Sequence, residues 1–356
     1  MKKLLAALLV LAMMLMGVAA LAEGDGYELA LVTDVGNIDD QSFNQSSYEG
    51  MVAFAEANGL TYAYYRPSED STDARVESMR AAIENGAKVV VCPGYLFEDS
   101  VYLVQDEYPE VNFLLLDGEP HSADYSEYKT AANTHCILYR EEQAGFFAGY
   151  AAVKDGYTEL GFAGGMAVPA VIRFGYGFVQ GADAAAQEMG VNVNVKYWYA
   201  DSFAPSDDIK NKAASWYTEG TEVIFSCGGG ICTSIIAAAE EGDGKVIGVD
   251  SDQYYLSEVV ITSAMKDLPN SVQISLGALY DNGGTWPEDY AGATQTLGAA
   301  ENCVGIPTAE HSWRFETYTV EEYNELYAKV QSGEIEISNS TDAMPETVNV
   351  TVDDQT

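Results

Sequence analysis

The chain has 356 residues, of which 47% are hydrophobic, and it carries 17 Lys or Arg against 55 Asp or Glu, for a formal net charge of −38. That length exceeds one ordinary domain, so two lobes are expected, and the hydrophobic content excludes wholesale disorder. The charge excludes a protein that binds nucleic acid or an anionic membrane through basic patches. It favours a weakly self-associating chain, so we expect a monomer. With three histidines in all, a histidine-dependent active site or metal site is not expected.

The first 22 residues predict a secretory signal peptide. Lys2 and Lys3 form a basic start, an apolar run follows, and residues 20–22 (ALA) fit the small-x-small cleavage rule. An uncleaved transmembrane anchor is the alternative, but the apolar stretch is short and a cleavage site is present. No cysteine lies at the cleavage point, so a lipid anchor is not supported. We therefore expect an extracytoplasmic protein, in the periplasm or at the cell surface.

Strand and helix signals alternate through the first part of the chain. Strands are expected over residues 28–33, 60–65, 88–92 and 111–116, with helices over 42–58, 73–85 and 98–107 between them. The helical segments repeat apolar residues at spacings of three and four, and glycines follow the first two. Strands that alternate with helices of this length predict right-handed βαβ units and a mostly parallel sheet.

The same pattern restarts after a helix expected over residues 141–154. The later strands are expected over residues 159–163, 192–199, 223–226, 245–249 and 259–263, with helices over 175–189 and 205–219. Two Rossmann-like lobes are therefore expected in tandem, joined near residues 133–139. The tail from Ser338 is polar and acidic, and residues 348–352 alternate like a short edge strand or are simply loose.

The five cysteines are an odd number, so at least one thiol stays free or pairs with another chain. Cys227 and Cys232 are too far apart for a CxxC redox or zinc motif and lack partner histidines. A disulfide between them is an open alternative, but a role as small buried hydrophobic residues is favoured.

Polar residues at the expected strand ends carry the functional argument, because open parallel sheets bind ligands outside the carboxyl ends of their strands. These residues are Asp34 to Asp40, Asp117, Gly228 to Gly230, and Asp250. Carboxylates that face one crevice repel each other unless a ligand offers donors or a cation intervenes. Phe43 can stack on a planar ligand, and Lys266 could supply a balancing positive charge. Each acid alone could be a helix cap or a turn residue, but together they favour a ligand site.

Residues 34–45 (DVGNIDDQSFNQ) resemble the signature of the basic membrane protein family, the purine nucleoside receptor A-like substrate-binding proteins of ABC importers. The similarity extends over about residues 27–335. It continues through residues 116–118 (LDG), 174–178 (FGYGF), 246–253 (VIGVDSDQ) and 262–266 (TSAMK). The resemblance implies the α/β type I periplasmic-binding-protein fold, in which two lobes with parallel sheets are joined by three hinge crossovers around a cleft that closes on a ligand.

This fold implies lobes that are not continuous in the sequence. The N-terminal lobe would hold residues 27–135 and about 256–292, and the C-terminal lobe would hold residues 136–255 and about 293–335. Residues 336–356 would form an acidic tail.

The resemblance also implies how the site would hold the base of a nucleoside. A purine-type ring would stack on Phe43. Asp34, then Asp40 or Asn44, and Asp117 would lie near the base.

For the sugar, the resemblance implies that Asp250 and Lys266 hold the ribose hydroxyls, with the backbone of Gly228 and Gly229 nearby. Phe174 fits best as the second stacking aromatic. The alternatives are Trp198, Phe203 and Trp216.

The expected function is that of a solute-binding protein which captures a small planar ligand, a purine nucleoside first, and delivers it to an ABC transporter permease. No enzymatic activity, cofactor or resident metal is expected. Riboflavin or another heterocycle is an alternative ligand, and a surface sensor or adhesin of the same fold is an alternative role. A nucleoside hydrolase would need Ca²⁺ at Asp34, Asp39 and Asp40, and the signal peptide, the resemblance and the missing general-acid histidine count against it.

Overall fold

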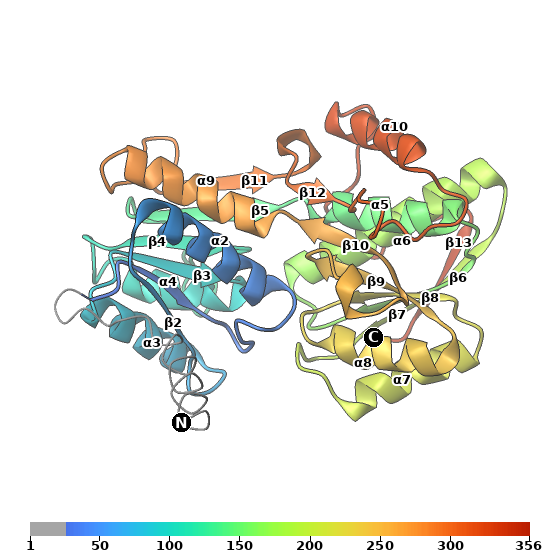
Figure 1. The fold of residues 1–356 in the computed structure, drawn as a ribbon, viewed down its shortest axis with the longest axis horizontal. Helices are drawn as coiled ribbons and strands as arrows, with labels where there is room; N and C mark the ends of the chain where they lie inside the picture. The colour runs from blue at the N-terminus through green and yellow to red at the C-terminus, as the bar shows by residue number, and fades with distance from the viewer. Residues whose placement is uncertain (1–25) are drawn as a thin grey trace, which may run out of the picture.

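The computed structural model describes residues 26–356, which form two α/β lobes side by side (Figure 1). The expected signal peptide, residues 1–22, lies outside the described residues. Within residues 26–356, no helix has the length and apolar character needed to span a membrane.

The first lobe is built on a six-stranded sheet in which every neighbouring pair is parallel, in the order β11-β5-β4-β3-β1-β2. Its strands are β1 (Leu29–Val32), β2 (Tyr62–Tyr65), β3 (Val89–Pro93), β4 (Asn112–Leu116), β5 (Thr134–Tyr139) and β11 (Thr294–Leu297). Its helices are α2 (Phe43–Asn58), α3 (Thr72–Glu84), α4 (Glu98–Val104) and α9 (Leu268–Asp281). Successive side chains of a strand point to opposite faces, so Leu29 and Leu31 pack in the core with α2 and α9, whereas Ala30 and Val32 pack with α3 and α4.

The second lobe is built on a seven-stranded sheet in the order β12-β10-β9-β8-β6-β7-β13, antiparallel only between β12 and β10. Its strands are β6 (Glu159–Gly164), β7 (Val193–Tyr199), β8 (Val223–Cys227), β9 (Lys245–Asp250), β10 (Val260–Lys266), β12 (Val304–Gly305) and β13 (Val350–Asp354). Its helices are α5 (Glu141–Lys154), α6 (Pro169–Met189), α7 (Asp207–Thr218), α8 (Ile231–Gly242) and α10 (Val320–Gln331). Glycines let α5 and α6 touch backbone to backbone, since a Cβ at Gly145 would lie 2.1 Å from the carbonyl oxygen of Phe174.

The chain crosses between the lobes three times, from β5 to α5, from β10 to α9 and from β11 to β12, as the resemblance implied. The crossings come later than expected. Residues 136–139 pair within the first sheet, residues 260–266 within the second, and residues 294–297 within the first again. The strand signals locate these segments but do not reveal which sheet each one joins. The expected lobe boundaries at 135, 255 and 292 therefore lie too early in the chain.

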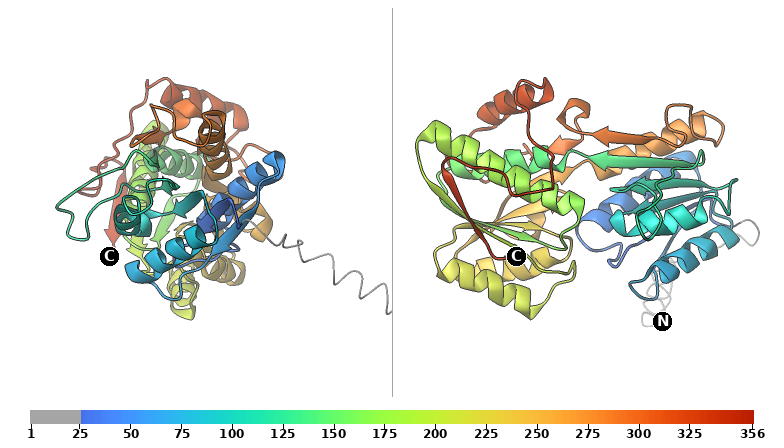
Figure 2. Two further views of the ribbon diagram at one scale, coloured as in Figure 1. Left: turned by 90° about the vertical axis from the view of Figure 1, so that its left-hand side faces the viewer. Right: turned by 180° about the vertical axis from the view of Figure 1, so that it is seen from behind.

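The end of the acidic tail is an edge strand, not a loose segment. β13 pairs in parallel with β7, with Val350 opposite Val193, and runs along the far side of the second lobe (Figure 2). The carboxylate Oδ1 of Asp183 on α6 accepts hydrogen bonds from the backbone N–H groups of Val348, Asn349 and Val350, at 2.9, 2.7 and 3.0 Å. The tail is therefore anchored, and it covers a sheet edge that would otherwise offer unpaired backbone groups.

No disulfide joins the cysteines of residues 26–356, and all five are buried. Cys227 ends β8 and Cys232 lies in the first turn of α8. Burial raises the pKa of the Cys232 thiol to about 12, and it raises that of Cys227 well above its usual value. Both residues behave as small buried hydrophobic side chains, the role that the sequence favoured.

Candidate functional site

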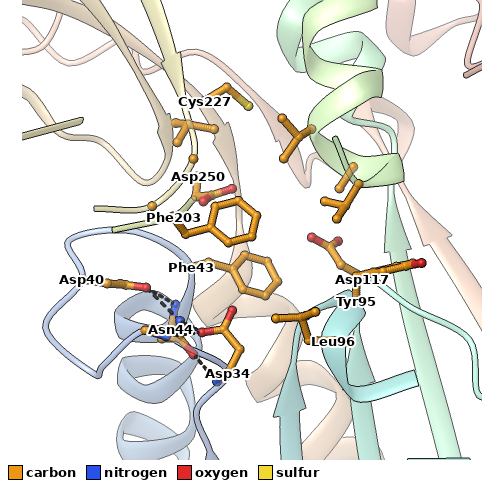
Figure 3. Close-up of a pocket in the computed structure, with 18 of the residues that line it drawn as sticks. Asp34, Asp40, Phe43, Asn44, Tyr95, Leu96, Asp117, Phe203, Cys227 and Asp250 are labelled. Carbon is orange, nitrogen blue, oxygen red and sulfur yellow. Dashed lines mark hydrogen bonds between the residues drawn. The ribbon is translucent and has the colours of Figure 1, made fainter. Parts of the chain in front are cut away.

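A cavity lies between the lobes, where the carboxyl ends of strands from both sheets meet (Figure 3). It contains about 750 Å³ of space between protein atoms, part of it open to solvent. All ten residues predicted to bind a ligand line this cavity: Asp34, Asp40, Phe43, Asn44, Asp117, Phe174, Gly228, Gly229, Asp250 and Lys266.

Asn44, in the first turn of α2, organises the loop that follows β1. Its side-chain amide donates to Asp34 Oδ1 at 2.8 Å and to Asp40 Oδ2 at 2.9 Å, as the dashed lines in Figure 3 show. Its Oδ1 accepts from the backbone N–H of Asp34 at 3.2 Å. The polar atoms of Asn44 are thus occupied within the loop, so Asn44 positions Asp34 instead of presenting its amide to a ligand.

Asp40 caps the N-terminus of α2. Its Oδ1 accepts from the backbone N–H groups of Ser42 and Gln45 at 2.9 and 3.0 Å, and its Oδ2 accepts from that of Asn44 at 3.0 Å. A helix start needs such acceptors because its first N–H groups have no partner within the helix. Asp40 therefore lines the cavity as a structural residue, which is the helix-cap role that the sequence left open.

Asp34 keeps one oxygen available. Its Oδ1 accepts from the backbone N–H of Gly36 at 2.7 Å as well as from Asn44, whereas its Oδ2 has no hydrogen-bond partner within residues 26–356. Burial raises the pKa of Asp34 to about 6, against the opposing effect of those two hydrogen bonds. At neutral pH the side chain is ionised and offers an acceptor to a donor on a ligand.

Asp250 ends β9 and faces the same cavity from the second lobe. Its Oδ2 accepts from the hydroxyl of Ser42, in the first lobe, at 2.6 Å. Its φ of 63° is in the left-handed region, which non-glycine residues rarely adopt and which is often found at functional sites. Burial raises the pKa of Asp250, while Lys266 and the Ser42 hydroxyl oppose the rise.

Lys266 ends β10 and is the centre of a buried charge network. Its ammonium group pairs with Asp117, at the end of β4 in the first lobe, and lies 3.2 Å from Glu141 Oε1, at the start of α5. Glu141 in turn accepts from Arg173 Nε of α6 at 2.5 Å. Lys266 is 3% exposed and Glu141 is fully buried, so these charges interact with little solvent screening.

The charged groups of this network shift one another's pKa. Burial raises the pKa of Asp117 to about 7 against the pull of Lys266, and the Glu141 carboxylate adds to the rise. Burial alone would lower the pKa of Lys266, but the carboxylates of Asp117, Glu141 and Asp250 raise it above its usual value. Asp117 Oδ1 is buried and has no hydrogen-bond partner in the part of the chain that the structure describes. A buried acceptor without a partner is costly, so a ligand donor is expected there.

Two aromatic rings enter the cavity from opposite lobes. Phe43 opens α2 in the first lobe, and Phe203 lies in the loop after β7 in the second (Figure 3). Phe174 also lines the cavity, but it is 1% exposed and its ring packs edge-on against Phe225 in the core, with centroids 6.0 Å apart. The geometry therefore favours Phe203 over Phe174 as the second stacking residue. Trp216 lies on α7 and is 2% exposed, packed in the core with residues of α8.

The glycine loop after β8 brings bare backbone to the cavity. A Cβ at Gly228 would lie 2.7 Å from the backbone of Gly165, so only glycine fits. Gly229 has a φ of 54°, which glycine adopts without strain. A ligand can therefore approach this backbone closely.

Several apolar residues that line the cavity were not predicted. Tyr95 and Leu96 lie in a short 3₁₀ turn after β3, and Val168 and Val171 lie at the start of α6. The Pro93-Gly94 step at the end of an expected strand was the signal that could have indicated the first pair. Pro169, at the first position of α6, is the signal that could have indicated the second pair, because proline is favoured at the first position of a helix.

The calcium site of the hydrolase alternative is not assembled. Within residues 26–356 there is no group of three or more His, Cys, Asp or Glu side chains placed to hold a metal ion. Asp39 is exposed and accepts from the Asn37 amide at 2.8 Å, whereas Asp34 and Asp40 both accept from Asn44.

Comparison with known proteins identifies the family to which the chain belongs. Residues 27–341 match the Bmp family, described as ABC transporter substrate-binding protein PnrA-like. The ABC transporter nucleoside-binding protein BmpA of Lactococcus lactis subsp. cremoris is 29% identical over 267 residues, which are 68% of this chain and 72% of that protein. Basic membrane protein B of Borreliella burgdorferi is 28% identical over 288 residues, 79% of this chain and 81% of that protein.

A solved structure shares the fold. The crystal structure of an ABC transporter system solute-binding protein from Aeropyrum pernix K1 superposes with a TM-score of 0.74, at 22% identity, over 89% of this chain and 94% of that chain. At this identity the likeness speaks for the fold alone, and it supports the periplasmic-binding-protein architecture.

Proposed function

The chain belongs to the Bmp family of PnrA-like ABC transporter substrate-binding proteins, and on that premise we propose that it captures a purine nucleoside in the interlobe cavity and delivers it to an ABC importer outside the cytoplasm. Substrate-binding proteins of ABC transporters bind small molecules and pass them to permeases. The proposal adds the ligand class and the residues that would hold it.

The observation that carries this proposal is the pattern of free acceptors between two aromatic rings. Asp34 Oδ2 and Asp117 Oδ1 have no hydrogen-bond partner within residues 26–356, and both residues line the cavity. Phe43 and Phe203 flank the same space (Figure 3). A purine nucleoside has a planar ring to stack and donors on both its base and its ribose, and it carries no charge. Stacking contributes about 1–3 kcal/mol per base.

The charge of the cavity supports a nucleoside over a nucleotide. Among the residues of 26–356 that line the cavity, Lys266 is the one basic residue, and its ammonium group already pairs with Asp117 and Glu141. A phosphate would meet the carboxylates of Asp34 and Asp250 without a free cation to balance it. The name of the Lactococcus relative, a nucleoside-binding protein, agrees with this ligand class.

A ligand panel tests the proposal. The thermal unfolding midpoint of residues 23–356 would be measured with nucleosides, free bases, nucleotides, riboflavin and simple sugars, with and without Ca²⁺. Each ligand that raises the midpoint would then be titrated calorimetrically. A ligand at 100 times its Kd adds about 2.7 kcal/mol to the free energy of unfolding, which raises the midpoint by several degrees. We expect purine nucleosides to give this shift. A shift with riboflavin alone would change the ligand and keep the fold, and a shift with Ca²⁺ alone would refute a nucleoside site.

The affinity for a purine nucleoside is expected to fall as the pH falls. The pKa of Asp117 is about 7 and that of Asp34 about 6, both raised by burial, so a ligand that donates to these carboxylates must displace protons at lower pH. Each such proton costs about a tenfold loss of affinity per pH unit below the pKa. The fall should therefore begin near pH 7 and steepen below pH 6, in titrations between pH 8 and 5. In Asp34→Asn the overall affinity is lower, and the steeper part of the fall disappears. The same profile for the parent and Asp34→Asn would show that Asp34 does not receive a ligand donor.

A further inference from the structure

One loop residue of the first lobe, Gln41, is hydrogen bonded by three side chains of the second lobe. Its backbone carbonyl accepts from Gln253 Nε2 at 2.8 Å and from Ser251 Oγ at 3.2 Å. Its side-chain Oε1 accepts from the hydroxyl of Tyr255 at 2.7 Å. We call these four residues the interlobe clasp. It joins the loop that leads into α2 to the segment that follows β9 (Figure 1).

The second-lobe side of the clasp is held in place by its own lobe. Gln253 is fully buried; its Oε1 accepts from the backbone N–H of Val249 at 3.0 Å, and its own N–H donates to Ser263 Oγ at 3.0 Å. Its Nε2 is therefore aimed at the first lobe by bonds that do not depend on the first lobe. The Gln253 amide donor is therefore oriented before the lobes come into contact.

The first-lobe side is held in the same way. Gln41 has a φ of 60°, which is uncommon for a residue other than glycine. Its backbone N–H donates to Gln45 Oε1 at 3.1 Å, and its side-chain Nε2 donates to the carbonyl of Asp39 at 3.3 Å. These bonds within the loop turn the carbonyl and the Oε1 of Gln41 outward. The interlobe bonds can then form only when the lobes come together.

The clasp lies outside the ligand cavity. The described residues that line the cavity do not include Gln41, Ser251, Gln253 or Tyr255. The Ser42–Asp250 hydrogen bond lies immediately beside the clasp, and Asp250 lines the cavity. The clasp therefore adjoins the site without touching what occupies it.

We propose that the interlobe clasp is a set of positioning residues that stabilises the closed arrangement of the lobes and so sets how long the ligand is retained. Its effect on affinity rests on the proposed function, whereas its effect on closure does not. Bonds made only in the closed arrangement raise the fraction of molecules that are closed. The apparent Kd is inversely proportional to that fraction, so it falls as the fraction rises. Losing the clasp should speed ligand release and leave ligand entry unchanged.

The chain offers a matched pair of variants for the test. Tyr255→Phe removes only the hydroxyl that donates to Gln41. Tyr254→Phe makes the same chemical change at the neighbouring residue, whose hydroxyl makes no hydrogen bond within residues 26–356 and whose ring packs on His311 with centroids 4.2 Å apart. Gln41→Gly removes the side-chain Oε1 that accepts from Tyr255, leaves the backbone carbonyl that accepts from Gln253 and Ser251, and keeps a residue suited to a positive φ. The combination of Gln41→Gly and Tyr255→Phe should then cost less than the sum of its parts.

Closure can be measured without any ligand. Spin labels at Asp73→Cys and Asp208→Cys would occupy exposed positions in the first turns of α3 and α7, one on each lobe, while the native cysteines are buried. Double electron–electron resonance then reports the fraction of molecules with a short distance between the lobes. The same labelled proteins would be titrated with inosine, and its association and dissociation rates measured by stopped flow.

We expect Tyr255→Phe to lower the short-distance fraction and to weaken inosine binding about 2- to 12-fold, through dissociation alone. Tyr254→Phe should match the parent, and the thermal midpoint of ligand-free Tyr255→Phe should lie close to that of the parent, because the loss of one hydrogen bond changes the midpoint only slightly in a chain of this size. If the short-distance fraction and the dissociation rate are the same in Tyr255→Phe and the parent, the proposed role of the clasp in closure is wrong. If the parent binds no purine nucleoside, the proposed function fails. The short-distance fraction of the ligand-free proteins then still tests whether the clasp stabilises the closed arrangement.

Discussion

Replacing Lys266 with methionine is expected to lower the free energy of unfolding by about 3–5 kcal/mol and to abolish nucleoside binding. The ammonium group pairs with Asp117 and Glu141, and all three side chains are buried. Methionine keeps most of the volume but leaves Asp117 without its cation and leaves Glu141 with Arg173 alone. A buried charge that has lost its partner is among the most destabilising changes a protein can carry.

The pH dependence of this loss has a definite sign. The pKa of Asp117, already about 7, should rise further in Lys266→Met because its nearby cation is gone. A carboxyl group with a raised pKa binds its proton more tightly in the folded state, so folding is favoured as the pH falls. The deficit relative to the parent should be largest near pH 8 and shrink toward pH 5, in urea unfolding followed by circular dichroism.

Two further variants make the result specific to Lys266. Lys210→Met breaks an exposed pair with Glu241 and should change the unfolding free energy by about 1 kcal/mol or less. Lys266→Met combined with Asp117→Asn should recover part of the stability and none of the binding. Parent-like stability for Lys266→Met at pH 8 would mean that the buried carboxylates are not held by this charge.

Alanine substitutions at Phe203 and at Phe174 are expected to distinguish a side chain that stacks on the ligand from one that packs in the core. Phe203 is only partly buried and lines the cavity, so Phe203→Ala should weaken nucleoside binding by about 1–3 kcal/mol, roughly 5- to 150-fold, with little change in stability. Phe174 is fully packed against Phe225, so Phe174→Ala should lower the free energy of unfolding by about 3–5 kcal/mol. Calorimetric titration and urea unfolding of both variants measure the two effects.

Phe43→Ala is the reference for this comparison, since Phe43 faces the same cavity from the other lobe and should lose affinity as Phe203→Ala does. The opposite pattern, in which Phe174→Ala stays stable and loses affinity while Phe203→Ala binds normally, would restore Phe174 as the stacking residue. That is the choice the sequence alone favoured.

The cavity residues at strand ends were predictable because of a simple geometric fact. Parallel strands all present their carboxyl ends to one edge, so Asp34, Asp117 and Asp250 could be grouped before the strands were placed in space. The glycines after β8 followed from the same rule. Alternation of strand and helix signals likewise predicted the α/β class, and the resemblance supplied the two lobes and three crossovers.

The roles within the cavity were harder to predict, because they depend on which atoms already have partners. Asp40 and Asn44 belong to the same motif as Asp34, yet their hydrogen bonds are consumed inside the loop. Glu141 has the sequence pattern of an exposed acid at a helix start, and only the structure shows that it lies beneath Lys266. Phe203 lies in an irregular loop, where no periodicity indicates the direction of a side chain.

Because the chain crosses between the lobes three times, neither lobe can be isolated as one continuous fragment. The first sheet needs β11, from residues 294–297, and the second needs β13, from residues 350–354, so each lobe draws on segments far apart in the sequence. A single proteolytic nick cannot release either lobe intact, and a fragment that stops after β5 or begins at α5 lacks part of its own sheet. During synthesis, neither lobe can be completed until most of the chain has left the ribosome.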